Sequence, residues 1–152
     1  MIYYLIFVCL SLLSLWLAWK ISVTDFKRRI IPDVYLFPLM LIGLIFVVFF
    51  PWICSVQESV LGAFFGYGLA MITGILFSKT RPDLDSPIGM GDIKMLSAGG
   101  LWLGVTGLSI ALILSCIFGS AWGWYKKQKY IPFGPFFIAS SFLTLIILRF
   151  LL

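Results

Sequence analysis

Two aspartates lie where long apolar runs meet charged segments of the chain. Asp25 follows a charge-free run over residues 1–19, and Asp92 precedes a charge-free run over residues 95–125. A carboxylate at the centre of a bilayer costs about 2.5–3.5 kcal/mol, so an aspartate at such a boundary needs a reason. Two carboxylates facing one another in a partly dry site share a proton, so that one activates water and the other polarises a carbonyl group. This is the chemistry of an aspartyl protease, and the alternatives are solvated loop carboxylates or groups that contact lipid headgroups.

Three segments around these aspartates carry recognisable motifs. Residues 25–33 read Asp-Phe-Lys-Arg-Arg-Ile-Ile-Pro-Asp, residues 89–94 read Gly-Met-Gly-Asp-Ile-Lys, and residues 131–136 read Ile-Pro-Phe-Gly-Pro-Phe. In this order they resemble motifs of the type IV prepilin peptidases, a family of membrane aspartyl proteases of the GxGD type. The resemblance covers about residues 15–145.

The resemblance implies roles for individual residues. Asp25 and Asp92 match the two catalytic aspartates of the family. Asp33 matches the second aspartate of the first motif, which is not catalytic. Together with Pro32 it is expected to begin the second helix, because a carboxylate suits a helix N-terminus.

Other motif residues are expected to support the site. Gly89 and Gly91 lack a Cβ, so the backbone can approach the substrate or a facing helix closely. Lys94 either holds negative charge near the site or extends toward lipid phosphate. The turn over residues 132–135 either lines the site or is a rigid entry into the last helix.

The sequence departs from the family pattern in two places. Many members have paired CxxC motifs linked to N-methylation of the processed pilin, whereas the three cysteines of this chain do not pair and it has no histidine. We therefore expect a peptidase without N-methylation and without a metal or other cofactor. Members also often have a glutamate six residues before the second catalytic aspartate, where this chain has Ser86, with Asp85 adjacent as a substitute.

The composition shows which elements position these residues. Of 152 residues, 62% are hydrophobic and 11% are charged, whereas about a quarter of a soluble domain is charged. A membrane-spanning helix needs about 20 apolar residues. Charged residues divide the chain into five long charge-free intervals. One has 31 residues, and each of the other four fits one helix. The predicted fold is an all-α, polytopic membrane protein with six transmembrane helices over about residues 2–20, 34–52, 58–78, 95–106, 108–125 and 133–151.

The basic residues favour two short helices within the longest interval. With two helices there, three basic clusters share one side, and short loops rich in lysine and arginine stay cytoplasmic. Both termini would then lie on the non-cytoplasmic side, and ten of the eleven basic residues on the cytoplasmic side. Four glycines offer places to turn, at Gly99, Gly100, Gly104 and Gly107.

The predicted function is removal of the short basic leader from type IV prepilins or pseudopilins by a single membrane-embedded peptidase domain over residues 1–152. The resemblance implies a bacterial inner membrane, cleavage at its cytoplasmic face, and substrates whose hydrophobic helix stays in the membrane. The other expected partner is membrane lipid and not nucleic acid, because no basic domain exists. A small ion or proton-coupled transporter and a non-catalytic assembly factor of a pilus or secretion machine are the alternatives.

Overall fold

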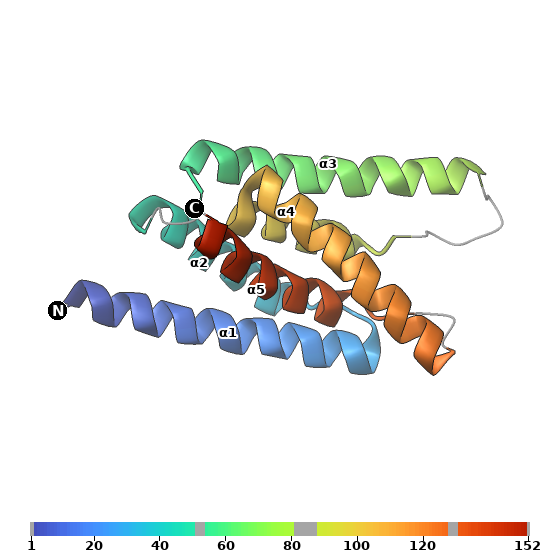
Figure 1. Cartoon of the computed structure of the whole chain (residues 1–152), viewed down its shortest axis with the longest axis horizontal. Coiled ribbons are helices and arrows are strands. Elements are labelled where there is room, and N and C mark those ends of the chain that lie inside the picture. Colours follow the sequence, from blue (N-terminus) through green and yellow to red (C-terminus); the bar gives the residue numbers. More distant parts are fainter. Residues whose placement is uncertain (1, 51–53, 81–87, 128–130, 152) are drawn as a thin grey trace.

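Helices are the only regular secondary structure in the part of the chain that the computed structural model describes, residues 2–50, 54–80, 88–127 and 131–151. All helices except α2 are long and apolar enough to cross a membrane, as expected of a multi-pass membrane protein. The shorter α2 has 17 residues, or about 25 Å, and contains Pro38. The helices are α1 (Ile2–Arg28), α2 (Asp33–Phe49), α3 (Val56–Thr80), α4 (Met90–Lys126) and α5 (Phe133–Leu151) (Figure 1).

The all-helical prediction is confirmed, but the described chain has five helices rather than six. The element α4 covers both segments predicted over residues 95–106 and 108–125, as two helical parts joined at a kink. The predicted ends were wrong at both site helices, because α1 continues eight residues past Lys20 and α4 begins five residues before Met95. Both aspartates therefore lie within helices rather than beside them. The six membrane crossings and the side on which the termini lie stay predictions.

A sharp kink divides α4 at Gly104. The backbone there has φ 68° and ψ −175°, a left-handed conformation that glycine adopts without steric cost. Leu108 packs back against the first part of the helix, since a Cβ placed on Gly99 would lie 3.4 Å from its Cδ1 atom. In Figure 1 the yellow part of α4 runs toward the left and the orange part returns to the right. The chain thus reverses direction within the long interval, as expected, although at Gly104 rather than near residue 107.

Four helices surround a common space. Because α1 packs against α2 and α5, and α4 packs against the same two helices, α1 and α4 lie on opposite sides of a ring. The remaining helix, α3, packs against the first part of α4. The last turns of α1, α3 and α4 each carry basic residues, and these helix ends all point to the right in Figure 1.

Glycines set the distance between α3 and α4. A Cβ on Gly100 would overlap the carbonyl oxygen of Gly62, and a Cβ on Gly66 would overlap the carbonyl oxygen of Leu96. Next to this contact, the Ser59 hydroxyl donates a hydrogen bond to the carbonyl oxygen of Leu101. Small residues that let two backbones approach closely are a common basis of helix packing in membranes.

We expect Gly100→Ala to destabilise the fold by about 3 kcal/mol or more, because the obstacle is backbone that cannot move aside as a side chain could. The measurement is thermal unfolding of the purified protein in detergent. Gly74→Ala is the matched control, since a Cβ at Gly74 meets no atom within 4 Å. Equal unfolding temperatures for the two variants would contradict the close packing of α3 on α4.

Candidate active site

Asp25 lies in the last turns of α1 and is 5% exposed. Its Oδ2 atom accepts a hydrogen bond of 2.7 Å from the backbone N–H of Gly134, in the first turn of α5. The first N–H groups of a helix have no partner within the helix, and the helix dipole favours negative charge at that end. The carboxylate of α1 therefore satisfies the N-terminus of α5.

Asp92 lies in the first turn of α4 and is partly buried. Gly89 is extended, with φ −66° and ψ 144°, and its carbonyl oxygen accepts the N–H of Asp92 at 3.0 Å. A Cβ on Gly89 would lie 3.6 Å from the Oδ2 atom of Asp92, an ordinary van der Waals contact, so Gly89 lies directly beside the carboxylate. The carboxylate of Asp25 thus lies at the N-terminus of α5, and Asp92 lies at the N-terminus of its own helix, α4; negative charge is favoured at both places.

The two carboxylates line one cavity of about 310 Å³. The segment after α1 contributes Arg29, whose φ of 54° is unusual for a residue with a side chain. Charged and apolar groups both face the cavity, and it is large enough for water and a short stretch of peptide. Its lining residues are Asp25, Arg29, Ile30, Ile31, Gly89, Gly91, Asp92, Ile131, Pro132 and Phe133.

The other predicted supporting residues hold the walls of this cavity. A Cβ on Gly91 would lie 3.0 Å from the Cβ of Ile31, so the start of α4 packs closely on the segment before α2. Pro32 precedes α2 in an extended conformation, and its carbonyl oxygen accepts the N–H groups of Tyr35 and Leu36 at 3.1 and 3.2 Å. Asp33 lies in the first turn of α2, as expected.

Lys94 and Asp33 form an ion pair between α4 and α2. The Nζ atom of Lys94 lies 2.7 Å from Oδ2 of Asp33 and 5.7 Å from the centre of the Phe37 ring. The sequence left two roles open for Lys94, binding a negative charge near the site or extending toward lipid phosphate. In the structure its partner is a negative charge, the carboxylate of Asp33 on the neighbouring helix α2. Because Lys94 follows Asp92 by two residues, this ion pair ties the start of α4 to the start of α2.

We expect Lys94→Glu to lower any activity of the site two- to fivefold, because the two side chains are 35% and 47% exposed and exposed ion pairs contribute about 0.2–1 kcal/mol. Adding Asp33→Lys, which restores opposite charges, should recover most of the loss. The measurement is the initial rate at equal protein concentration. A double variant no better than Lys94→Glu would show that the ion pair does not position α4.

The cavity also contains residues that the sequence motifs did not single out. Arg29 and Ile131 line the cavity although neither was singled out, and the only available signal was their place within two of the motifs. The turn over residues 132–135 lines the site, as one alternative held, and also begins α5. Asp85 and Ser86 lie outside the described residues. Among those described, no group of three or more histidine, cysteine or acidic residues could hold a metal ion.

The fold and the site define a class: a multi-pass helical membrane protein in which two aspartates from opposite helices share one cavity. The sequence model of the type IV leader peptidase family matches residues 5–124, and the chain belongs to this family. The family is the one that the motifs resemble.

Curated relatives agree with this family. The chain is 31% identical over 144 residues to the prepilin leader peptidase/N-methyltransferase of Burkholderia pseudomallei (strain K96243), covering 90% of this chain and 44% of the relative. It is 29% identical to the proteins of the same name from Aeromonas hydrophila, covering 90% and 48%, and Pseudomonas aeruginosa, covering 89% and 48%. The chain thus spans about half the length of the curated relatives it matches. No solved structure matches it.

Proposed function

We propose that this protein is an aspartic endopeptidase that removes the leader peptide of type IV prepilins or pseudopilins. The observation that carries the proposal is the shared cavity, into which α1 and α4 bring Asp25 and Asp92 from opposite sides of the helix ring. Each aspartate belongs to a motif that resembles the family pattern, and family membership adds the reaction class.

The proposed reaction uses the two carboxyl groups in complementary forms. One is ionised and takes a proton from a water molecule, while the other is protonated and donates a hydrogen bond to the carbonyl oxygen of the cleaved peptide bond. Water adds to the carbonyl carbon, the C–N bond then breaks, and the leaving nitrogen receives a proton. The hydrogen bond from the N–H group of Gly134 fixes one oxygen of Asp25, so the carboxylate of Asp25 is oriented before substrate arrives.

We place the site at the cytoplasmic face of a bacterial inner membrane. The basic last turns of α1, α3 and α4 point in one direction, which supports a common cytoplasmic side under the positive-inside rule. Asp25 and Asp92 lie near the helix ends on that side, so water reaches them without crossing lipid. A substrate with a basic leader and a hydrophobic helix can then remain in the membrane while its leader is cut.

The proposal is limited to peptide hydrolysis. The names of the relatives join a leader peptidase to an N-methyltransferase, and the chain matches about half of their length. Within these 152 residues no CxxC pair occurs, so N-methylation is not part of the proposed activity.

The direct test is cleavage of a prepilin by the purified protein in lipid vesicles. We expect release of the intact leader and a shortened pilin, both identified by mass spectrometry, and none from vesicles without the protein. Cleavage at one defined bond supports the proposal. The proposal would be overturned if correctly inserted protein left several prepilins of the host intact.

A further inference from the structure

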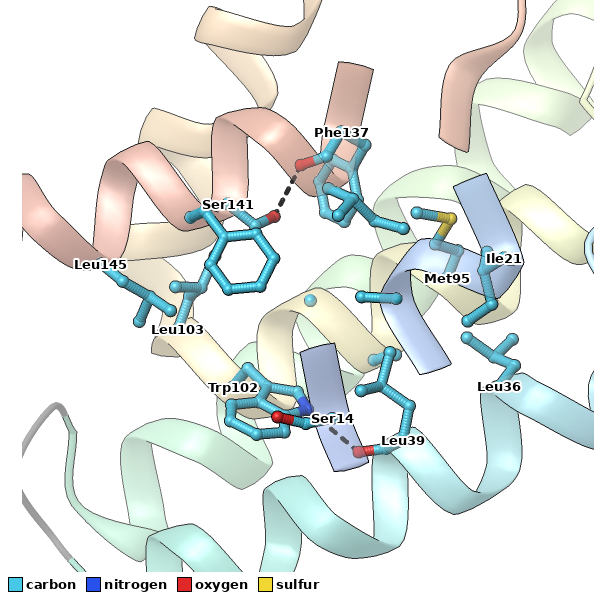
Figure 2. Close-up of a pocket in the computed structure, with 15 residues that line it drawn as sticks. Ser14, Ile21, Leu36, Leu39, Met95, Trp102, Leu103, Phe137, Ser141 and Leu145 are labelled. Atoms are coloured by element: carbon cyan, nitrogen blue, oxygen red, sulfur yellow. Dashed lines mark hydrogen bonds between the residues drawn. The ribbon is translucent and has the colours of Figure 1, made fainter. Parts of the chain in front are cut away.

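A second cavity, of about 90 Å³, lies inside the ring formed by α1, α2, α4 and α5. Figure 2 shows side chains from these helices surrounding an open centre. About 10–15 Å³ is enough for one water molecule, so this space accepts a group of several heavy atoms. Among the side chains labelled around it are Ser14, Ile21, Met95, Trp102, Phe137 and Ser141.

The cavity suits an apolar group. Its three polar side chains already donate hydrogen bonds to backbone carbonyl oxygens: Ser14 to Ser11 at 2.8 Å, Ser141 to Phe137 at 2.8 Å, and Trp102 to Leu39 at 3.0 Å. The last two are the dashed lines in Figure 2. A polar ligand would find no free hydroxyl or indole donor in this lining, whereas an apolar ligand would lose nothing by entering.

The cavity lies inward of the site on the same helix faces, and the two cavities share no lining residue. Residues three or four apart share one face of a helix. Ile21 of the inner cavity therefore lies one turn below Asp25 on α1, and Met95 lies one turn below Asp92 on α4. On α5, Phe137 lies one turn below Phe133. Neighbouring turns of three helices thus line the site and the apolar space.

We propose that the inner cavity binds the apolar side chains immediately after the cleaved bond of the substrate. This inference rests on the proposed function, which places a peptide bond between the two carboxylates and an apolar segment on its C-terminal side. One helical turn rises about 5.4 Å and an extended chain about 3.3 Å per residue. The first two residues after the cleaved bond therefore span the depth of the cavity, and because successive side chains of an extended chain point to opposite faces, one of the two enters it.

The test compares two prepilins that differ only in these two residues, leucine–leucine or alanine–alanine. The measured quantity is the ratio of their kcat/KM values, which does not depend on how much of each enzyme variant is folded. The wild-type protein should prefer the leucine substrate by about tenfold or more, the usual effect of filling an apolar pocket. A ratio near one would overturn the inference.

Ala98→Leu should reduce this preference about tenfold, since Ala98 is 3% exposed and lines the cavity, so that the added side chain occupies the space. Ala121→Leu is the matched control on the same helix, because Ala121 is exposed, and its ratio should equal that of the wild type. An equal loss of both substrates in Ala98→Leu would indicate a packing defect or a bound lipid chain, and would overturn the inference.

A second variant covers the case in which Ala98→Leu does not fold. Leu145→Ala enlarges the same cavity and should shift preference in the other direction, toward a prepilin with phenylalanine at the two positions. An unchanged preference in this variant overturns the inference while cleavage itself still supports the proposed function. Failure of the wild-type protein to cleave any of these prepilins overturns the proposed function instead.

Discussion

Asp25→Asn and Asp92→Asn are each expected to lower prepilin cleavage by about a thousandfold or more. Asparagine has nearly the shape of aspartate, but it cannot take a proton from water, and general acid–base catalysis contributes about 10²–10⁴-fold. In the Asp25→Asn variant the amide oxygen of the new side chain can still accept the N–H of Gly134, so the start of α5 keeps its partner. The loss should therefore appear in kcat and not in the amount of inserted protein.

Asp33→Asn is the matched control for these two substitutions. Asp33 belongs to the same motif as Asp25, but its carboxylate pairs with Lys94 and does not line the shared cavity. Its replacement should cost only a few-fold, as expected for a partly exposed ion pair. Leader release by each variant, measured by mass spectrometry at equal protein amounts, separates the two effects. Normal processing by Asp25→Asn or Asp92→Asn would exclude the aspartyl mechanism.

The two candidate carboxylates could be predicted because a charged side chain is costly to place beside a membrane-spanning run. An apolar run long enough to cross a membrane predicts a helix, and a carboxylate at its edge has to be explained by function or by contact with water. The motifs then separated Asp25 and Asp92 from the other acidic residues. That the two side chains line one cavity depends on the ring of four helices, which local sequence does not determine.

Helix ends were harder to predict than helices. Lys20 ends the first charge-free run, yet α1 continues to Arg28. The ammonium group of Lys20 lies 5.5 Å from the ring of Trp16 and 5.7 Å from that of Trp19. The long aliphatic side chain of lysine carries the charge to these rings, so the helix continues past Lys20. A lone lysine therefore marks the edge of an apolar run better than it marks the end of a helix.

The turn within α4 shows why the right glycine could not be chosen from sequence. Three of the four candidates are needed for packing: a Cβ would meet Phe137 at Gly99, the backbone of Gly62 at Gly100, and side chains of Leu103 and Leu148 at Gly107. At Gly104 the nearest atoms are 3.5 Å away, and it is the backbone conformation that requires glycine. The distinction rests on contacts between helices, whereas the four residues look alike in the sequence.

The contacts that orient the site also join residues far apart in the chain. Lys94 and Asp33 are 61 residues apart, and Gly134 and Asp25 are 109 apart. The third motif placed Gly134 in a turn that either lined the site or only began a helix. The structure shows that the turn does both, because Pro132 and Phe133 line the cavity, and Gly134, in the first turn of α5, donates its N–H group to the carboxylate of Asp25.

Gly134→Ala is expected to lower kcat about a hundredfold while the fold persists. A Cβ at this position would lie 2.8 Å from Oδ2 and 3.2 Å from the Cβ of Asp25, so the buried carboxylate has to move. A displacement of about 1 Å at a reacting group can cost about 10²-fold in rate. Alanine keeps the backbone N–H, so the change tests the position of the carboxylate rather than the loss of its hydrogen bond.

The control for Gly134→Ala is Gly74→Ala, which adds the same methyl group where no atom lies within 4 Å and should leave kcat unchanged. Thermal unfolding of both variants in detergent separates a displaced carboxylate from a damaged fold. If the Gly134→Ala variant cleaves at the wild-type rate, the carboxylate of Asp25 tolerates displacement. The hydrogen bond from the start of α5 then does not prepare this carboxylate for catalysis. If cleavage falls while the unfolding temperature stays within a few degrees of the control, the N-terminus of α5 positions Asp25 for the reaction.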